Sequence, residues 1–424
     1  MVDQLQASSS SDLRRANIGR LLRSVHTQGP ASRAELARTL GLARSTIGSL
    51  VEELVARGLV AEGPARESTG RGRPSPVVGA SPAGPVVVAL DISTDSLAAA
   101  VVGIGGEVFR ERRVERERRP QDAEDVVALL RDLATPMVAE VGAGRVIAIG
   151  VSSPGSIQDG YLRASVNLGW RAVALDRMVA DSLGLDVPVA VGNDANAATV
   201  AEHIRGAGVG VSDLVVLWGE EGIGAGIVAG GRPLMGHEGY AGRVGHWPLS
   251  TEGITCGCGS VRCWETVIGE EALLRRLGAQ GATRRAAVER AIGLLVAEDP
   301  VAEAAFRPIA GWLGIGIAAL AETFNPQVIV LGGFLGRLFR YAEAEILAQL
   351  REPDLSPPRE SVRVVPSRLG GESALLGAAE LAFAGLLADP TAYRRRRTGR
   401  ASTYLARRPA TPRETVSARS SEVG

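Results

Sequence analysis

All three cysteines of the chain fall within eight consecutive residues, at Cys256, Cys258 and Cys263. His246, one of only four histidines, lies ten positions before the first of them. Three thiolates and one imidazole complete a tetrahedral Zn²⁺ ligand set, and a loop of this kind is held by the metal rather than by an apolar core. Because no coordination position stays open, the pattern predicts structural rather than hydrolytic zinc. Incidental free thiols are the alternative, although random placement seldom gathers every cysteine of a chain.

Length and composition point to a soluble protein of several domains. A chain of 424 residues exceeds one ordinary domain, and 45% hydrophobic with 22% charged residues excludes wholesale disorder. The longest apolar run, over 309–321, ends at Glu322 and is shorter than the ~18–20 residues that span a bilayer. The start of the chain lacks the pattern of a signal peptide, and three cysteines cannot form a disulfide framework. A cytoplasmic protein without a membrane partner is therefore predicted.

The net charge of zero hides a division along the chain. Residues 1–80 carry a net charge of +4 and residues 389–424 carry +6, so the middle of the chain is acidic. Every one of the 47 basic residues is an arginine, a bias that genomic base composition also produces. A basic end on an acidic body is the charge pattern of a DNA-binding appendage.

Three short helices are predicted near the N-terminus. Apolar residues at i, i+3, i+4 and i+7 predict the first, from Asn17 to a turn at 29–30. Ser32 and Glu35 form a capping box that opens the second, which runs to about Leu40. The third begins near residue 44 and buries an apolar stripe. Short strands at 59–62 and 77–78 follow, so the segment is typical of a winged helix-turn-helix.

This winged helix-turn-helix is expected over residues 14–80, after a flexible start at 1–13. The third helix leaves on its outer face the side chains that would enter the major groove, namely Arg44, Ser45, Thr46 and Ser49. Arg71 and Arg73 lie at the tip of the wing, where they would enter a minor groove or contact phosphates. The alternatives are a helical protein-interaction module and a solvated charged loop for the wing.

Beyond Pro85 the pattern changes to alternating strands and helices. Two tandem segments, 85–200 and 201–387, each open with strands joined by a glycine turn and continue with helices and further strands. Two such segments predict an α/β fold of two lobes with a ligand cleft between them. The tail, 388–424, shows no apolar period and is predicted to be disordered and solvated.

Two motifs in these lobes are candidates for ligand binding. Asn193 and Asp194 directly follow a predicted strand at 187–191, and carboxylates at this end of a strand commonly bind ligands in α/β sheets. The glycine-rich turn at 222–226 is either a phosphate-cradling turn or a tight hairpin. A glycine-spaced loop, 236–246, leads directly into the predicted metal site.

Together these motifs resemble the ROK family of repressors, open reading frames and kinases. The resemblance covers about residues 14–387, and the segments that carry it are Asn193–Ala198, Gly222–Gly226, Ala241–His246, Cys256–Cys263, Pro154–Ile157, Asn167–Trp170 and Asn325–Gly333. With its winged helix, the chain is most similar to the branch of xylose- and N-acetylglucosamine-repressor-like regulators.

The resemblance implies a bilobal domain of the actin-like, hexokinase-like ATPase type that binds a sugar in its cleft. Asn193 and Asp194 would hold sugar hydroxyls, and His246 would ligate Zn²⁺ beside the sugar. Glu265 would contact the sugar itself. In kinases of the family, the residue that matches Asp194 is the general base for the accepting hydroxyl.

Two departures from the family's kinases argue against catalysis. Those kinases read Asp-x-Gly-Gly-Thr where residues 91–95 read Asp-Ile-Ser-Thr-Asp, so the glycines that turn around ATP phosphates are gone. Glu220 and Glu221 precede the second glycine turn, and carboxylates repel a phosphate there. The chain is therefore predicted to have no enzymatic activity.

A third departure concerns the ligand. Arg243 stands three residues before the zinc histidine, where the family usually has Glu. Arg243 either holds an acidic ligand, such as a sugar phosphate or a sugar acid, or turns away into an ion pair beside a degenerate sugar pocket.

These expectations combine into a transcriptional regulator, in the simplest case a repressor of carbohydrate-use genes. Its predicted partners are a double-stranded DNA operator and a sugar or sugar-phosphate effector. A homodimer or homotetramer is expected, because two winged helices read a palindrome by symmetry. The alternatives are an ATP-dependent sugar kinase that retains a DNA-binding head, and a ligand-independent DNA-binding protein with a vestigial sensor.

Overall fold

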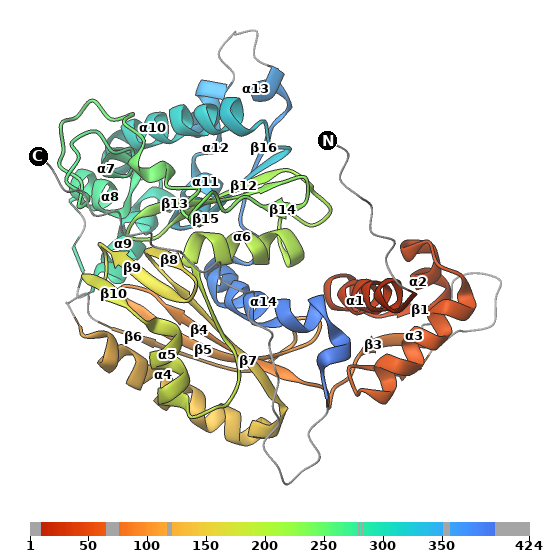
Figure 1. Ribbon diagram of the computed structural model, residues 1–424. Helices are drawn as coiled ribbons and strands as arrows, with labels where there is room; N and C mark the ends of the chain where they lie inside the picture. The colour runs from red at the N-terminus through yellow and green to blue at the C-terminus, as the bar shows by residue number, and fades with distance from the viewer. Residues whose placement is uncertain are drawn as a thin grey trace, which may run out of the picture.

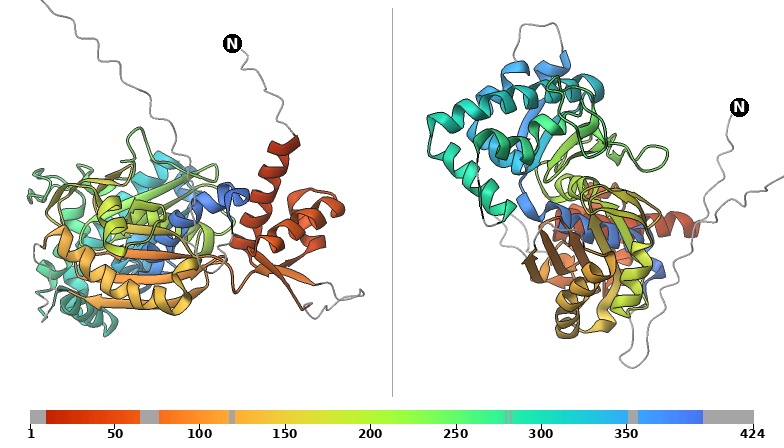
Figure 2. Two further views of the ribbon diagram at one scale, coloured as in Figure 1. Left: turned by 60° about the horizontal axis from the view of Figure 1, so that its bottom comes forward. Right: turned by 90° about the vertical axis from the view of Figure 1, so that its left-hand side faces the viewer.

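The structure, a computed structural model, describes residues 10–64, 76–116, 121–278, 280–281, 283–350 and 357–394. Two α/β lobes face each other, and a small winged helix lies at one side of them, next to the last long helix (Figure 1). The side views show the same arrangement, with the winged helix projecting from the body (Figure 2).

The winged helix contains three helices and a three-stranded sheet in the order β1-β3-β2. Its elements are α1 (Ser10–Gln28), β1 (Ala31–Ser32), α2 (Arg33–Leu40), α3 (Arg44–Ala56), β2 (Val60–Gly63) and β3 (Val77–Ala80). The predicted capping box is confirmed, since Ser32 Oγ accepts from the Glu35 amide at 3.2 Å and Glu35 accepts from the Ser32 amide at 2.7 Å. Helix α1 begins at Ser10, inside the stretch 1–13 expected to be flexible. The sequence did not indicate this start, because the polar first turns of the helix carry no apolar period.

The first lobe has a five-stranded sheet in the order β11-β7-β4-β5-β6 and a small sheet in the order β10-β9-β8. Sequence reasoning did not predict the small sheet. The elements are β4 (Val86–Ile92), β5 (Ser96–Gly103), β6 (Val108–Glu115), α4 (Ala123–Val141), β7 (Val146–Ser153), β8 (Ser156–Gln158), β9 (Tyr161–Ser165), β10 (Trp170–Val173), α5 (Leu175–Leu183) and β11 (Val189–Asn193). Helices α4 and α5 share an apolar core with one face of the five-stranded sheet.

The second lobe repeats the topology of the first. An antiparallel meander is followed by two strands added in parallel on the other side, which gives the order β14-β13-β12-β15-β16. The strands are β12 (Leu214–Gly219), β13 (Ile223–Ala229), β14 (Arg232–Pro233), β15 (Val328–Gly333) and β16 (Arg363–Pro366). The helices are α7 (Glu265–Ile268), α8 (Glu270–Leu277), α9 (Arg284–Val296), α10 (Pro300–Phe324), α11 (Phe334–Tyr341), α12 (Glu343–Leu347) and α13 (Pro357–Ser361).

Two helices, α6 (Asp194–Arg205) and α14 (Ser373–Ala388), pack against each other between the sheets of the two lobes (Figure 1). A Cβ at Gly377 would lie 1.9 Å from the Ala197 carbonyl oxygen, so only glycine permits this close approach. Helix α6 covers β12 and β13 of the second lobe, whereas α14 lies on β4 and β7 of the first.

The position of α14 corrects the expected extent of the second lobe, 201–387. Phe383 and Leu386 of α14 share one core with the first-lobe sheet and with Leu21 of α1. The chain therefore returns to the first lobe with α14, and this helix also packs against α1 of the winged helix. An apolar period in the sequence cannot show which of two sheets a helix covers.

Helices α10 and α14 are long and apolar enough to pass a hydropathy test for membrane spans, although neither contains a long uninterrupted apolar run. More than half of each apolar segment is buried inside the protein. Both are core helices: α10 packs in the second lobe, and α14 packs on the first.

Candidate functional site

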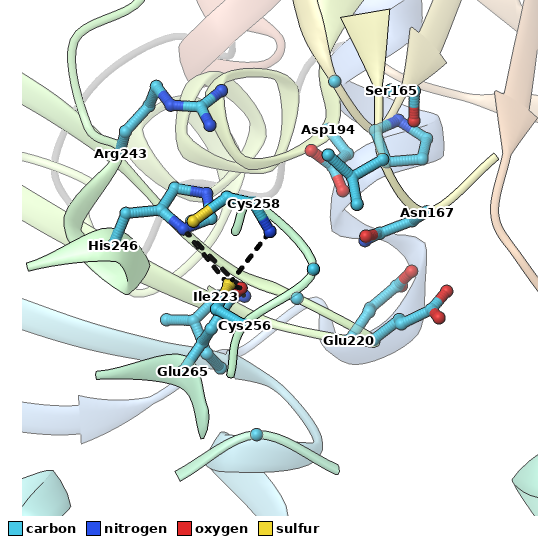
Figure 3. Close-up of a pocket in the computed structure, with 18 of the residues that line it drawn as sticks. Ser165, Asn167, Asp194, Glu220, Ile223, Arg243, His246, Cys256, Cys258 and Glu265 are labelled. Carbon is cyan, nitrogen blue, oxygen red and sulfur yellow. Dashed lines mark hydrogen bonds and ion pairs between the residues drawn. The ribbon is translucent and has the colours of Figure 1, made fainter. Parts of the chain in front are cut away.

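A cavity of about 660 Å³ lies between the lobes, and the predicted ligand-binding residues meet in it (Figure 3). The first lobe contributes Pro154–Ser156, Ser165, Asn167, Asn193 and Asp194 to its walls. The second lobe contributes Glu220–Ala225, Arg243, His246 and Glu265. Residues from both lobes, between positions 154 and 265, therefore form a single site.

The Asn193 and Asp194 side chains are held at the start of α6. Asn193 caps the helix, because its Oδ1 accepts from the Asn196 amide at 3.2 Å. Its Nδ2 donates to Asp194 Oδ1 at 2.7 Å and to the Gly155 carbonyl at 3.0 Å. Asp194 Oδ1 also accepts from the Ala195 amide at 2.9 Å. The bonds that Asn193 and Ala195 donate to the Asp194 carboxylate both end on Oδ1, so a ligand hydroxyl would approach Oδ2.

The environment of Asp194 suits a polar ligand that donates hydrogen bonds. Burial raises the pKa of the Asp194 carboxyl, while the amide donors of the helix start oppose that shift. A sugar hydroxyl would donate to Oδ2 and restore part of the solvation that the carboxylate loses in the cleft.

The four predicted zinc ligands come together as one cluster. The Sγ atoms of Cys256, Cys258 and Cys263 and a ring nitrogen of His246 all lie within 4.8 Å of one another. Cys258 Sγ is 3.5 Å from Cys263 Sγ, and His246 Nδ1 is 3.7 Å from Cys256 Sγ. A tetrahedral site with Zn–S bonds of about 2.3 Å has ligand separations of about 3.8 Å, so this donor set fits Zn²⁺.

Glu265, the first residue of α7, joins the metal cluster to the cavity. Its Oε1 accepts from the Cys256 thiol at 2.7 Å and lies 3.6 Å from His246 Nδ1. Its Oε2 accepts from the Ile223 amide at 3.4 Å. Burial raises the pKa of the Cys256 thiol and lowers the pKa of His246, and a bound cation would reverse the first effect by stabilising the thiolate.

Arg243 spans the cleft. It is exposed on a second-lobe loop, and its Nη1 donates to Ser156 Oγ of the first lobe at 2.9 Å. Its guanidinium lines the cavity beside His246 (Figure 3). Within the part of the chain that the structure describes, no carboxylate forms an ion pair with it. Arg243 therefore lines the cavity wall and bonds to the opposite lobe.

Acidic side chains gather at Glu220 and Asp91, in the two segments that depart from the kinase pattern, and a hydrogen bond joins the lobes there. Ser93 Oγ donates to Glu220 Oε2 at 2.9 Å. Burial, together with the charges of Asp91 and Asp194, raises the pKa of Glu220 well above its usual range. Burial also raises the pKa of Asp91 to about 6, although the Arg113 guanidinium lies 3.7 Å away. An anionic phosphate would raise the pKa values of these crowded carboxyl groups further, and this coupling opposes its binding here.

On α3 the structure separates the four predicted DNA contacts into two pairs. Arg44 and Ser45 are exposed, and Thr46 and Ser49 are half-buried. Ser49 Oγ donates to the Thr46 carbonyl at 3.0 Å and accepts from Arg14 at 3.4 Å, so it partly serves the fold of the domain. Arg71 and Arg73 lie outside the described residues.

Sequence reasoning missed two hydrogen bonds between the lobes, those of Ser93 and Ser156. The sequence offered a hint for each residue. Ser93 stands where the family's kinases have a glycine, and Ser156 belongs to the family-like motif Pro154–Ile157. What the sequence could not show was that each bonds to the opposite lobe.

Comparison with known proteins agrees with this geometry. The ROK family profile matches residues 87–384, and the MarR family profile matches residues 19–72. The chain is 28% identical over 389 residues to a xylose repressor of Caldicellulosiruptor bescii, which covers 87% of this chain and 96% of that protein. It is 30% identical over 328 residues to a glucokinase of Streptomyces coelicolor, covering 70% of this chain and 97% of the glucokinase.

The solved structures give the same result. A crystal structure of a ROK family transcriptional regulator, described as a homolog of the E. coli MLC protein, superimposes with a TM-score of 0.70 at 26% sequence identity. The match covers 87% of this chain and 96% of the regulator. The two regulators therefore match more of the chain than the glucokinase does.

Proposed function

Since this chain belongs to the ROK family, we propose that it is a sugar-responsive transcriptional repressor of carbohydrate-use genes that acts in the cytoplasm. Its winged helix binds an operator, and a sugar or sugar derivative in the cleft controls that binding. One observation carries the proposal. A single chain joins an exposed recognition helix, with Arg44 at its start, to an interlobe cavity lined by Asn193 and Asp194.

In the cleft, each residue has a distinct part in the proposal. Asn193 and Asp194 hold sugar hydroxyls, and Glu265 contacts the sugar while it fixes the metal loop. His246, Cys256, Cys258 and Cys263 hold one structural Zn²⁺, which keeps the wall of the cavity folded and supplies no chemistry. A ligand that contacts both lobes changes the angle between them only if it binds two conformations of the protein, with different interlobe angles, with different affinities. As a homodimer or homotetramer, the protein would present two winged helices to a palindromic operator.

Arg243 favours an effector with an acidic group. Its guanidinium faces the cavity from one lobe and is held to Ser156 of the other. A phosphate or carboxylate would accept two parallel hydrogen bonds from it and would tighten the contact between the lobes. A sugar phosphate or sugar acid therefore fits the site better than a neutral sugar.

The Asp194→Asn variant tests the cleft. Loss of the charged acceptor is expected to weaken effector binding roughly 10- to 100-fold, because a hydrogen bond to a charged group contributes about 1.5–3 kcal/mol. Calorimetric titration with a panel of sugars and sugar phosphates measures the change. Asp181→Asn, which alters an exposed carboxylate of α5, is the matched control and should bind as the wild type does. Equal affinity of Asp194→Asn and wild type for the same compound would remove Asp194 from the site.

We propose further that the protein is not an enzyme. A sugar kinase with a DNA-binding head is the rival, and it would use Asp194 as its general base. The Ser93–Glu220 bond and the carboxylates beside it oppose ATP binding, so no ADP should form above the background rate with any sugar of the panel. ADP formation that stops in Asp194→Asn would establish the rival.

A further inference from the structure

A buried polar cluster joins the winged helix to the two central helices. It contains His26 of α1, Glu380 of α14 and Arg205, the last residue of α6. His26 Nε2 lies 2.7 Å from Glu380 Oε2, and Arg205 donates to Glu380 Oε1 at 2.7 Å. His26 is fully buried and Glu380 is 5% exposed. Burying charged groups costs free energy unless each one is paired, and apolar side chains would fill the same space without that cost. Packing alone therefore does not explain why these residues are here.

The hydrogen bonds of the cluster connect four parts of the fold. The Gly105 amide donates to His26 Nδ1 at 3.0 Å, while His26 Nε2 lies 2.7 Å from Glu380 Oε2 and 2.8 Å from Arg205 Nη2. Arg205 then supplies the positive charge for the Glu380 carboxylate, and His26 and Arg205 hold the pKa of Glu380 below its usual range despite burial. Arg205 also donates to the carbonyls of Gly105 at 2.7 Å and His26 at 3.3 Å. The three side chains thus tie α1, α6, α14 and the turn after β5 together.

Helix α6 connects this cluster to the cleft without interruption. It runs for 12 residues from Asp194, in the cavity wall, to Arg205, a length of about 17 Å. Near the Arg205 end, the buried Glu202 accepts from Ser367 Oγ at 2.5 Å and from Ser373 Oγ of α14 at 2.9 Å. A rigid-body shift of α6 at its cleft end would therefore displace Arg205 and these contacts with it.

We propose that His26, Glu380 and Arg205 form a coupling joint, which transmits the state of the cleft to the winged helix through α6. They act as positioning residues, because they touch neither the effector nor DNA. The inference rests on the proposed function, since it assigns the route by which effector and operator sense each other. Glu380 supplies the carboxylate of the joint: its Oε2 lies 2.7 Å from His26 Nε2 and its Oε1 accepts from Arg205, whose Nη2 lies 2.8 Å from His26 Nε2.

Reciprocity allows the joint to be tested without a known effector. If the cleft changes operator affinity, operator binding must change the cleft to the same extent. The probe is duplex DNA from the region upstream of the protein's own gene, added to saturation. The readout is hydrogen–deuterium exchange of the full chain in the peptides over 193–198 and 222–226, at the opposite end of α6 from the joint.

In the wild type, DNA should change exchange at the start of α6 by about 5-fold or more, given coupling of about 1 kcal/mol or above. In Glu380→Gln the change should fall to less than twofold although DNA still binds. His26→Phe, which keeps the Glu380–Arg205 pair, is the second variant if Glu380→Gln fails to fold. Glu140→Gln, which removes an exposed ion pair with Arg110 on the first lobe, should respond as the wild type does.

Each other result is decisive. A wild type that binds DNA specifically with no change at the cleft, or joint variants that keep the full change, would overturn the joint and leave the repressor proposal intact. A wild type without specific DNA binding would instead overturn the proposed function, and the joint with it.

Discussion

Cys258→Ser and His246→Ala are each expected to release the zinc and to lower the free energy of unfolding of the chain by at least about 5 kcal/mol. The metal-binding free energy of a structural zinc site is folding free energy, and it commonly amounts to about 10–16 kcal/mol. Between Thr251 and Cys263 only two residues, Cys256 and Cys263, are buried, so this loop has almost no apolar core of its own. Thermal unfolding followed by circular dichroism, with metal analysis of the same samples, measures both effects.

The control for the metal lies in the same loop. Val261→Ala changes an exposed side chain between two of the ligands, and it should retain one zinc per chain and the stability of the wild type. Complete removal of metal by a chelator should reproduce the effect of the ligand variants. A chain that keeps its full stability after chelation, or that is purified without zinc, would contradict the metal site.

Arg44→Ala is expected to weaken operator binding roughly 10- to 100-fold at each half-site. A base or phosphate contact by Arg contributes about 1–3 kcal/mol, and in a symmetric dimer the loss occurs twice. Arg44 is exposed at the first position of α3, and in the described part of the chain no hydrogen bond or ion pair holds it, so the fold should be unaffected. Fluorescence anisotropy with a labelled operator, at several salt concentrations, also reports whether the contact is to phosphate.

A matched variant distinguishes the effect of the position of Arg44 on operator affinity from the effect of losing one positive charge. Arg23→Ala removes the same charge from an exposed position on α1 and should change affinity only slightly. Equal losses in the two variants would show that the winged helix attracts DNA by net charge alone. Unchanged affinity in Arg44→Ala would place the DNA contacts elsewhere.

Much of the architecture was predictable because local signals agreed with one another. The capping box at Ser32, the apolar stripe of α3 and the strand at 86–92 each specify an element without help from distant residues. The metal cluster was visible for a related reason. Three of its four ligands lie on one loop, so spacing alone brings them together.

The parts that were missed depend on contacts between distant segments. His26 and Glu380 are 354 positions apart, and neither belongs to a motif. The assignment of α14 to the first lobe follows from which sheet its apolar residues meet, and an apolar period does not contain that information. The bond from Arg243 to Ser156 likewise exists only because the lobes close on each other. Sequence patterns therefore pointed to residues that line one cavity, and the structure showed the bonds that connect them.

The most direct test of the account is an operator titration. Labelled DNA from upstream of the gene is bound at fixed salt, and sugars, sugar phosphates and sugar acids are added one at a time to wild type and to Asp194→Asn. The account predicts that one compound, most readily an acidic one, releases the wild type at concentrations that leave Asp194→Asn bound. Specific binding that no compound alters would contradict it, and would identify a DNA-binding protein whose cleft no longer senses a ligand.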